Sequence, residues 1–311
     1  FTDAQLQAAS LLQPLGVLAG MGADELGAGK VTRAQMVAFI YRLTNGGDDG
    51  IDAYYSKTSQ YKDVDTEAWY APYLNWAYAS KVAFGYTDGN FGVNDYVTGA
   101  QAAAMLVRLL GKEASGNDYA LQAQSHAIAL GLDDGITTRG LYENALDRGD
   151  MFILLANTLM CEVKDTTLAE EVFDLEILYN VVLIGAEKTV GISKNDYTVF
   201  TFRAWTNSQD TLKFASRYLM VDDESGCKYT LLVSKSKDAN GYRTLYAAYE
   251  AEQDGYYNVI TGTVDDGALV FETVGSKKQN VFFDKDCVFY VDEKVATKAD
   301  FIAAYGKANW G

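Results

Sequence analysis

The 311-residue sequence is poor in histidine, in basic side chains and in long apolar runs, and each shortage excludes a class of function. With His126 as its only histidine, it cannot assemble a histidine-based catalytic triad or a zinc site that needs two histidines. Lys and Arg number 26 against 42 Asp and Glu, which gives a net charge of −16. That balance argues against a nucleic-acid partner, because phosphate binding needs clustered cations. No run of about 18 apolar residues is present, so we expect no membrane insertion.

Cysteine is also scarce, and its three positions are widely separated: Cys161, Cys227 and Cys287. They form no CxxC pair, which predicts small buried side chains and at most one disulfide. The acidic trio Asp63, Asp65 and Glu67 lacks the glycine and the distal glutamate of a calcium-binding EF-hand loop. We therefore expect no metal and no cofactor.

What the sequence does contain is a five-residue motif that recurs three times, each time before an apolar helical pattern. The copies are Val-Thr-Arg-Ala-Gln at 31–35, Val-Thr-Gly-Ala-Gln at 97–101 and Leu-Asp-Arg-Gly-Asp at 146–150. Thr32, Thr98 and Asp147 are good N-cap residues, and in the first two copies the glutamine three residues on completes a capping box. The apolar residues that follow are spaced i, i+3, i+4, i+7. The motif therefore predicts three helices that begin at one register.

The register extends upstream of each motif. A glycine precedes each copy at a near-constant interval (Gly20, Gly85 and Gly135), and a short helical pattern precedes each glycine. The first two copies open with an aromatic-x-Asp sequence, at 1–3 and 61–63. Such recurrence is typical of internal repeats, and one unit of this size cannot bury its apolar face alone. We expect residues up to about 160 to form one all-helical unit.

This unit resembles the S-layer homology (SLH) repeat, a cell-wall-anchoring module that usually occurs in threes. The matching features are the aromatic-x-Asp openings, Trp69 with the helical pattern behind it, the loop 85–91 (Gly-Tyr-Thr-Asp-Gly-Asn-Phe) and the Thr-Arg-Ala core at 32–34. The resemblance covers about half of the chain. It departs from the family where the usual glutamate after the core is replaced, where copy three lacks its opening, and at Gly99, where the family expects arginine.

The predicted domains follow from the repeats and from a change of periodicity after Met160. They are SLH-like repeats at 1–46, 61–111 and 117–160, a linker at 47–60 and a β-rich domain at 165–311. In the last segment short alternating strands rich in Tyr, Val, Phe and Thr are separated by turn clusters. The expected fold class is multidomain α and β: an all-α pseudo-threefold helical trimer, then an antiparallel β sandwich or barrel. One strand is expected from Val172, and a final helix at about 298–305.

The resemblance implies a function and a set of ligand contacts. The implied function is non-covalent anchoring of a secreted surface protein to the bacterial cell wall, by binding an acidic, pyruvylated-type secondary cell-wall polysaccharide in grooves between the repeats. The implied contact residues are Arg33, Arg148, Thr32, Trp69, Gly85, Tyr86, Asp3 and Asp63. The implied location is the cell surface or cell wall, and self-association there is left open.

Physical chemistry makes the motif arginine the best candidate. It stands in the first helical turn, where unpaired amides and the positive end of the helix dipole already favour an anion. A guanidinium adds a fork that matches a carboxylate. The competing interpretation for Arg33 is an intramolecular pair with an acid of its own repeat. Gly99 cannot supply the cation and has no evident structural benefit, so its groove is expected to bind an acidic sugar at least about tenfold more weakly.

An alternative function is a wall-tethered enzyme of the glycan hydrolase class, with its active site in the β-rich domain. The acidic residues Asp222, Asp223 and Glu224 carry almost no specificity in so acidic a chain, and no serine or cysteine nucleophile motif is present. A third interpretation makes the β-rich domain a structural or adhesive surface module. We therefore expect no enzyme.

Overall fold

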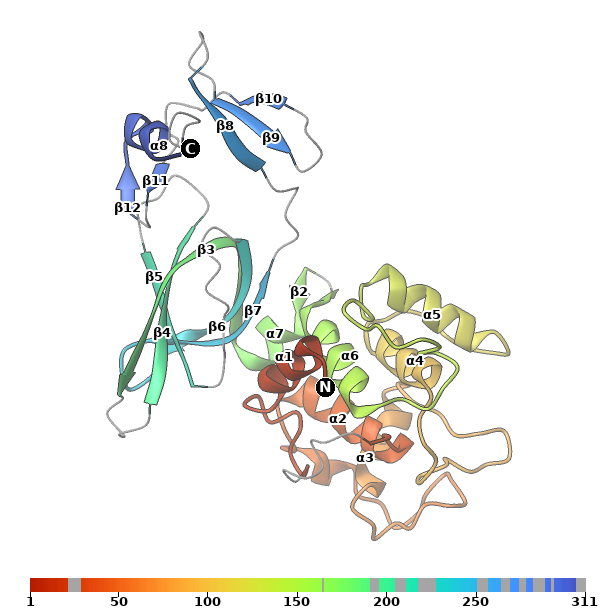
Figure 1. Cartoon of the computed structure of the whole chain (residues 1–311). Coiled ribbons are helices and arrows are strands. Elements are labelled where there is room, and N and C mark those ends of the chain that lie inside the picture. The colour runs from red at the N-terminus through yellow and green to blue at the C-terminus, as the bar shows by residue number, and fades with distance from the viewer. Residues whose placement is uncertain are drawn as a thin grey trace. The chain divides into compact units, whose positions relative to one another are not determined.

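The computed structural model divides into two compact units, Phe1–Glu176 and Ile177–Gly311 (Figure 1). It describes residues 1–21, 29–163, 165–190, 196–204, 211–217, 228–250, 257–263, 269–273, 278–281, 289–291 and 294–305. Helices fill the first unit and strands dominate the second, so the predicted mixture of α and β structure is confirmed. Asp222, Asp223, Glu224, Cys227 and Cys287 lie outside the described residues. Within the described ranges no helix is long and apolar enough to cross a membrane.

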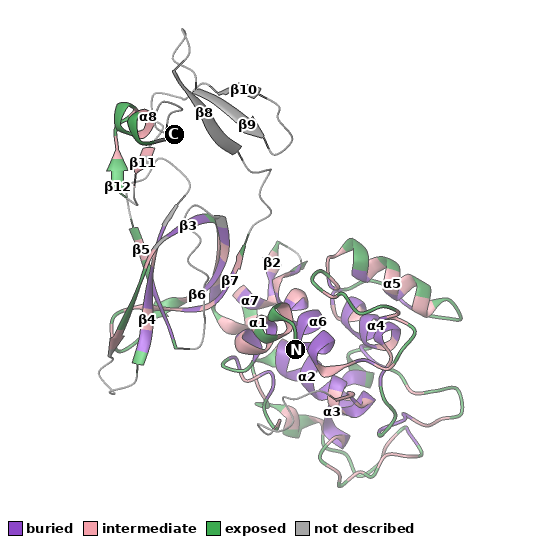
Figure 2. Ribbon diagram, viewed as in Figure 1, coloured by how far each residue is buried: buried purple, intermediate pink, exposed green. Residues whose placement is uncertain are grey.

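The first unit is a set of short helices around a shared apolar core. Its elements are α1 (Asp3–Leu12), α2 (Arg33–Asn45), η2 (Ile51–Tyr54), α3 (Ala71–Ala79), α4 (Gly99–Leu109), α5 (Tyr119–Ala129), α6 (Arg148–Met160), β1 (Glu162–Val163), β2 (Thr166–Thr167) and α7 (Leu168–Phe173). The helices that follow the three motifs are α2, α4 and α6, and among the helices of this unit they carry most of the buried residues (Figure 2). Pro72 falls in the first turn of α3, the one part of a helix that tolerates it.

Two of the three predicted caps are confirmed. The Thr32 hydroxyl accepts a hydrogen bond from the Gln35 amide at 3.2 Å, and the Gln35 side-chain carbonyl accepts one from the Thr32 amide at 3.0 Å. Thr98 and Gln101 form the same capping box. Asp147 occupies the N-cap position of α6, but its side chain makes no cap bond. Its carboxylate instead forms an ion pair with the Lys30 ammonium at 2.9 Å, and Lys30 lies outside α6.

The three motifs meet in a closed cycle of backbone hydrogen bonds. The Val97 amide donates to the Val31 carbonyl at 2.9 Å, Leu146 donates to Val97 at 2.8 Å, and Val31 donates to Leu146 at 3.3 Å. Each bond joins segments more than 40 residues apart in sequence, so the cycle ties the starts of α2, α4 and α6 to one another. Because all six groups are main-chain atoms beside buried valine and leucine side chains, pairing removes the cost of burying them unsatisfied.

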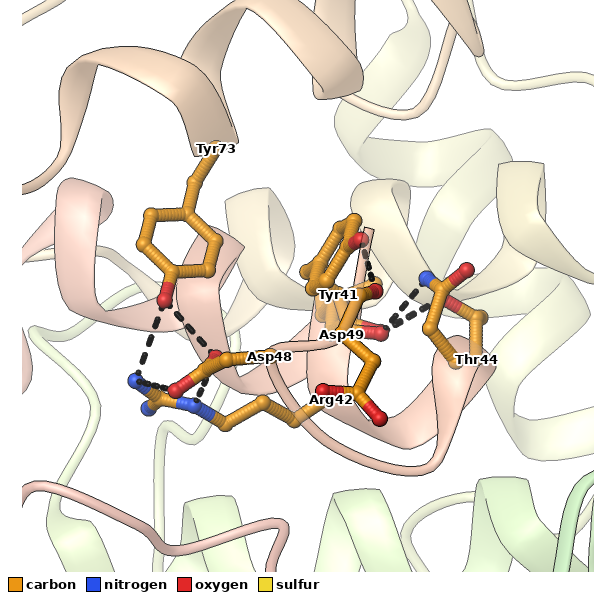
Figure 3. Close-up of polar contacts among 8 residues, drawn as sticks. Tyr41, Arg42, Thr44, Asp48, Asp49 and Tyr73 are labelled. Atoms are coloured by element: carbon orange, nitrogen blue, oxygen red, sulfur yellow. Dashed lines mark hydrogen bonds and ion pairs between the residues drawn. The ribbon is translucent and has the colours of Figure 1, made fainter. Parts of the chain in front are cut away.

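The segment predicted as a linker is built into the fold. Arg42, at the end of α2, donates to both carboxylate oxygens of Asp48 at 2.7 and 3.2 Å, and the Tyr73 hydroxyl of α3 donates to the same carboxylate at 2.7 Å (Figure 3). The Tyr41 hydroxyl donates to the carbonyl of Asp49 at 2.8 Å. Burial, together with the bond to Asp48, raises the pKa of Tyr73 to about 12. The turn after α2 is therefore fixed to both neighbouring helices.

Replacing Tyr73 with phenylalanine should lower the free energy of unfolding by about 1 kcal/mol, because one hydrogen bond to a partly solvated carboxylate is lost. Tyr96→Phe is the matched control, since Tyr96 is mostly exposed. Urea denaturation of the full chain, followed by circular dichroism, measures both changes. Equal stability of the two variants would contradict a stabilising role for this cluster.

The second unit contains a five-stranded barrel and two smaller sheets. Strands β3 (Leu175–Val190), β4 (Asp196–Ala204), β5 (Thr211–Ser216), β6 (Lys228–Lys237) and β7 (Arg243–Glu250) close in the order β3-β4-β5-β7-β6. Phenylalanines 200, 202 and 214 fill the interior with Leu231 and Leu245. The pairing of β5 with β7 is parallel, so the prediction of a wholly antiparallel sheet is wrong. Two strands that are not joined by a hairpin can pair either way, and local sequence does not decide which.

The remaining strands are short. They are β8 (Tyr257–Thr263), β9 (Leu269–Thr273), β10 (Lys278–Val281), β11 (Phe289–Val291) and β12 (Lys294–Ala296), followed by α8 (Lys298–Tyr305). The final helix is at its predicted position and packs against β8, β11 and β12. The strand expected from Val172 is wrong at its start, because α7 continues to Phe173. A capping box of Thr167 and Glu170 begins that helix.

Candidate functional site

The first residue of each motif helix faces a loop from another repeat. This contact is made by the backbone amide, whatever the side chain at the position. The amides of Arg33, Gly99 and Arg148 donate to the carbonyl oxygens of Asp95, Asn144 and Gly29 at 2.9, 3.1 and 2.9 Å. The motif position therefore lies at three related junctions between repeats, and its side chain decides what each junction contains.

At the first junction the Arg33 side chain is buried in the loop 84–91 of repeat 2. Its Nε donates to the Phe91 carbonyl and its Nη2 to the Phe84 carbonyl, both at 2.9 Å. The guanidinium carbon lies 4.6 Å from the centre of the Tyr86 ring and 4.7 Å from that of Phe91. Burial lowers the pKa of Arg33, which is 3% exposed. A hydrogen-bonded ion pair with an acid of its own repeat is not what holds this guanidinium: both carbonyl acceptors belong to repeat 2.

Two predicted site residues shape this same loop. The Asp63 carboxylate accepts hydrogen bonds from the backbone amides of residues 91–93 at 2.6, 2.8 and 3.3 Å. A Cβ atom at Gly85 would lie 2.5 Å from the Tyr61 ring and 2.6 Å from the Asn90 carbonyl oxygen, so glycine is required there. Asp63, Gly85 and Arg33 therefore all contribute to fixing the conformation of this loop.

Above the buried arginine, three aromatic side chains reach the surface. Tyr78, Phe84 and Tyr86 are 50%, 42% and 37% exposed, and we call them the aromatic platform. The rings of Tyr78 and Phe84 meet edge to face, with centroids 6.4 Å apart. A second guanidinium, that of the half-buried Arg108, lies 5.1 Å from the Phe84 ring. The platform thus combines exposed aromatic rings with one guanidinium packed against Tyr86 and another packed against Phe84.

The sequence reasoning identified Tyr86 but missed Tyr78, Phe84 and Arg108. The sequence does contain a signal for Phe84, because this aromatic residue adjoins the loop glycine Gly85. Nothing local marks Arg108, whose Nε and Nη2 donate to the Ala114 carbonyl and whose pKa burial lowers. Its place behind the platform depends on how α4 packs.

The other predicted residues are placed in different ways. The Thr32 side chain is engaged in its capping box, and Asp3 is exposed in the first turn of α1. Trp69 lies before α3, mostly exposed, with its ring edge to face against Tyr70 and Tyr73. Direct contact of any of them with a ligand stays a prediction.

The junction at Gly99 is filled by the chain itself. A Cβ atom there would overlap the carbonyl oxygen of Leu141 and lie 2.8 Å from the carbonyl carbon of the same residue. The Ala100 amide donates to the Tyr142 carbonyl at 3.1 Å, which holds this stretch of repeat 3 against the start of α4. The expectation that glycine has no structural benefit at position 99 is therefore wrong: close approach of two backbones requires it.

Arg148 lies half-buried at the third junction. Its guanidinium is beside Gly29, where a Cβ atom would lie 3.2 Å from Nη1. Residues 22–28 are outside the described part of the chain. Of the two motif arginines, Arg148 is the more exposed.

Asp63 should make the stability of the first unit depend on pH. Partial burial raises the pKa of Asp63, but the three amide donors outweigh it, and the pKa lies below its ordinary value. Its stabilising contribution is therefore present above the unfolded pKa of about 3.9 and is lost as pH falls through the lower folded value. Asp63→Asn should cost about 1–2 kcal/mol at neutral pH and flatten the decline in stability on acidification.

The measurement is the free energy of unfolding of wild type and Asp63→Asn at several pH values between about 7 and 3. Asp65→Asn is the control, because Asp65 is exposed and accepts only the nearby Glu67 amide. A variant curve parallel to that of wild type would show that Asp63 is not the titrating group.

Comparison with known proteins finds a family match in this part of the chain. Residues 60–103, which hold Asp63, the loop 84–91 and the start of α4, match the S-layer homology domain. The chain is 34% identical over 156 residues (50% of the chain, 14% of the relative) to the middle cell wall protein of Brevibacillus brevis. It is 29% identical over 230 residues (72% of the chain, 28% of the relative) to a cell surface protein of Thermoanaerobacter kivui. It is 36% identical over 105 residues (33% and 9%) to the surface layer protein of Brevibacillus choshinensis.

The chain spans less than a third of the length of each of these relatives. None of the three names is that of an enzyme. The domain match and the names together support localisation at the cell surface, as the sequence predicts. The chain carries an S-layer homology domain at residues 60–103 and is similar over part of its length to a cell-wall protein and a surface-layer protein.

Proposed function

We propose that residues 1–160 anchor the chain non-covalently to the bacterial cell wall by binding an acidic secondary cell-wall polysaccharide, of the pyruvylated type, in grooves between the repeats. One observation carries the proposal: in the aromatic platform, Tyr86 packs against the buried guanidinium of Arg33 and Phe84 against the half-buried guanidinium of Arg108. Exposed rings offer apolar faces to the C–H faces of sugars, and cations behind them attract a carboxylate.

We further propose that the three repeats are related by a pseudo-threefold axis. The closed cycle of hydrogen bonds among Val31, Val97 and Leu146 supports it, as do the equivalent amide contacts of Arg33, Gly99 and Arg148. In this arrangement each motif position belongs to one groove. The grooves are unequal, because the first contains a buried arginine, the second is closed by repeat 3, and the third contains the more exposed Arg148.

Binding works against the overall charge of the protein. The net charge of −16 repels an anionic polymer, but salt screens that field over about 8 Å at physiological ionic strength. Arg148 acts at contact distance, and Arg33 acts through the loop that it holds and through its charge. The attraction is therefore local, and affinity should fall as salt is raised.

The β-rich unit serves, in this proposal, as a non-catalytic structural or adhesive module at the cell surface. Support comes from the relatives, whose names describe wall and surface proteins. Within the described residues no three His, Cys, Asp or Glu side chains gather as metal ligands would.

Co-sedimentation with purified cell-wall sacculi tests the anchoring function. The chain should pellet with intact sacculi and remain in solution once the secondary polymer has been extracted. Equal pelleting before and after extraction would overturn the proposal, because the receptor would then be the peptidoglycan or a non-specific surface.

Arg148→Ala should weaken sacculus binding about tenfold or more, since a charge-assisted hydrogen bond contributes about 1.5–3 kcal/mol. Arg139→Ala is the matched control: it removes the same charge from an exposed position of the same repeat outside the motif. Binding isotherms at low and high salt compare the two. If both variants lose affinity equally, net charge alone explains the effect and the motif arginine has no special role.

A further inference from the structure

A shallow, open hollow of about 520 Å³ lies beside η2, and no motif arginine is part of its lining. It is lined by residues 53–56, 58–60 and Asn75, all within the described range 29–163. The volume is in the range that small-molecule sites use. Apart from Asn75, the lining belongs to the segment that the sequence predicts to be a linker. Neither the predicted repeats nor the proposed anchoring function therefore accounts for a hollow here.

The lining is uncharged and rich in hydroxyl groups. Tyr54, Tyr55, Ser56, Thr58 and Ser59 contribute hydroxyls, and Gln60 and Asn75 contribute side-chain amides. Each of these groups can both donate and accept hydrogen bonds. The tyrosines add flat apolar faces beside a polar tip. Lys57 and Asp52, the nearest charged residues in sequence, are not part of the lining.

The walls are held in place without a ligand. The Asn75 amide of α3 donates to the Tyr54 carbonyl at 2.9 Å, which joins the floor to η2. Two further bonds fix the turn beyond it, from the Thr58 amide to the Ser56 hydroxyl at 3.2 Å and from the Tyr61 amide to the Ser59 hydroxyl at 3.1 Å. The Tyr54 ring packs edge to face on Tyr41, with centroids 6.5 Å apart. A site fixed in this way loses little entropy on binding.

We propose that this hollow binds a neutral sugar, a hexose or N-acetylhexosamine unit of a glycan chain, at a site separate from the arginine-backed aromatic platform. Sugar hydroxyls need partners that both donate and accept, which the lining supplies, and sugar C–H faces need an aromatic surface, which Tyr54 and Tyr55 supply. An acidic sugar would find no cation in the lining. A wholly apolar ligand would leave its hydroxyls and amides without partners. The site does not depend on the proposed anchoring function.

The test is a titration of the full chain with N,N′-diacetylchitobiose, a neutral disaccharide, followed by two-dimensional NMR. We expect saturable shifts at Tyr54, Ser59 and Asn75, and an affinity that changes little between about 0.05 and 0.5 M salt. Digalacturonic acid should bind at least about tenfold more weakly. No saturable shifts at these residues, or a preference for the acidic disaccharide, would overturn the proposal.

Two exposed side chains allow variants that keep the fold. Tyr55→Ala should weaken binding of the neutral disaccharide about tenfold, and Gln60→Ala should weaken it less. Tyr96→Ala is the control, because Tyr96 is 59% exposed, much as Tyr55 is at 55%, and is not part of the lining. Unchanged affinity in Tyr55→Ala would assign the shifts to another surface. Loss of sacculus binding with this titration intact would refute anchoring and leave the sugar site standing.

Discussion

Gly99→Ala should lower the stability of the first unit by about 3 kcal/mol, although alanine is the better helix former by about 1 kcal/mol. The new methyl group would overlap the carbonyl oxygen of Leu141. That oxygen cannot withdraw freely, because the amides of Gly99 and Ala100 hold the same stretch through Asn144 and Tyr142. Overlap with fixed backbone therefore outweighs the gain in propensity. Thermal unfolding of the full chain should show the midpoint temperature of the first unit's transition lowered by roughly 6–12 °C.

Gly149→Ala is a matched control in the first turn of α6. A Cβ atom there would meet the side chain of Gln5, 2.6 Å from its Nε2. Unlike a backbone carbonyl, this side chain can rotate away, at the cost of its hydrogen bonds to the Asp150 carboxylate and from the Thr2 amide. We expect a loss of about 1 kcal/mol. If Gly99→Ala were as stable as Gly149→Ala or wild type, the backbone at Gly99 would not be in close contact with the backbone at Leu141.

The same contact bears on function. In Gly99→Arg the family's usual arginine is restored, yet the side chain has no room to enter the junction. We expect a destabilised protein with no gain in sacculus binding. In the proposed anchoring function, the weaker groove expected at position 99 would therefore result from chain packing as well as from a missing charge.

The sequence predicted best what is decided within a few residues. Thr32 and Thr98 each lie three residues from the glutamine that completes the cap, so the helix starts follow from local bonding. Asp147 is also a good N-cap residue, but no glutamine lies three residues on, and its carboxylate pairs with Lys30, far away in sequence, and makes no cap bond. The parallel pairing of β5 with β7 was missed for a similar reason. It depends on how the barrel closes, which no short window of sequence contains.

The candidate site shows the same division. The motif and the loop identified Arg33, Gly85 and Tyr86, because glycine and charge stand out in sequence. The burial of Arg33 and the exposure of Phe84 could not be read, since both depend on how the loop of repeat 2 folds over α2. A residue type can be recognised locally, but its exposure is a property of the assembled unit.

Arg33→Ala should be the most damaging substitution in the first unit, with a loss of about 3 kcal/mol or more. Removing the guanidinium leaves the carbonyl oxygens of Phe84 and Phe91 without their donor, and each unsatisfied buried group costs about 1–3 kcal/mol. The stacked rings of Tyr86 and Phe91 lose their cation as well. Arg139→Ala, which removes an exposed arginine, should change stability by less than about 0.5 kcal/mol.

Arg33→Lys separates the charge of this residue from its shape. Lysine keeps the positive charge, but its single ammonium cannot reproduce the fork that reaches both the Phe84 and the Phe91 carbonyls. If Arg33 holds the loop, the lysine variant should lose most of the stability that alanine loses. The aromatic platform should also become disordered, which tyrosine near-UV circular dichroism would report. Sacculus binding should fall with it. A lysine variant that is destabilised yet binds sacculi as tightly as wild type would separate the platform from wall binding. A lysine variant as stable as wild type would show that the buried charge alone, not the paired hydrogen bonds, orders the loop.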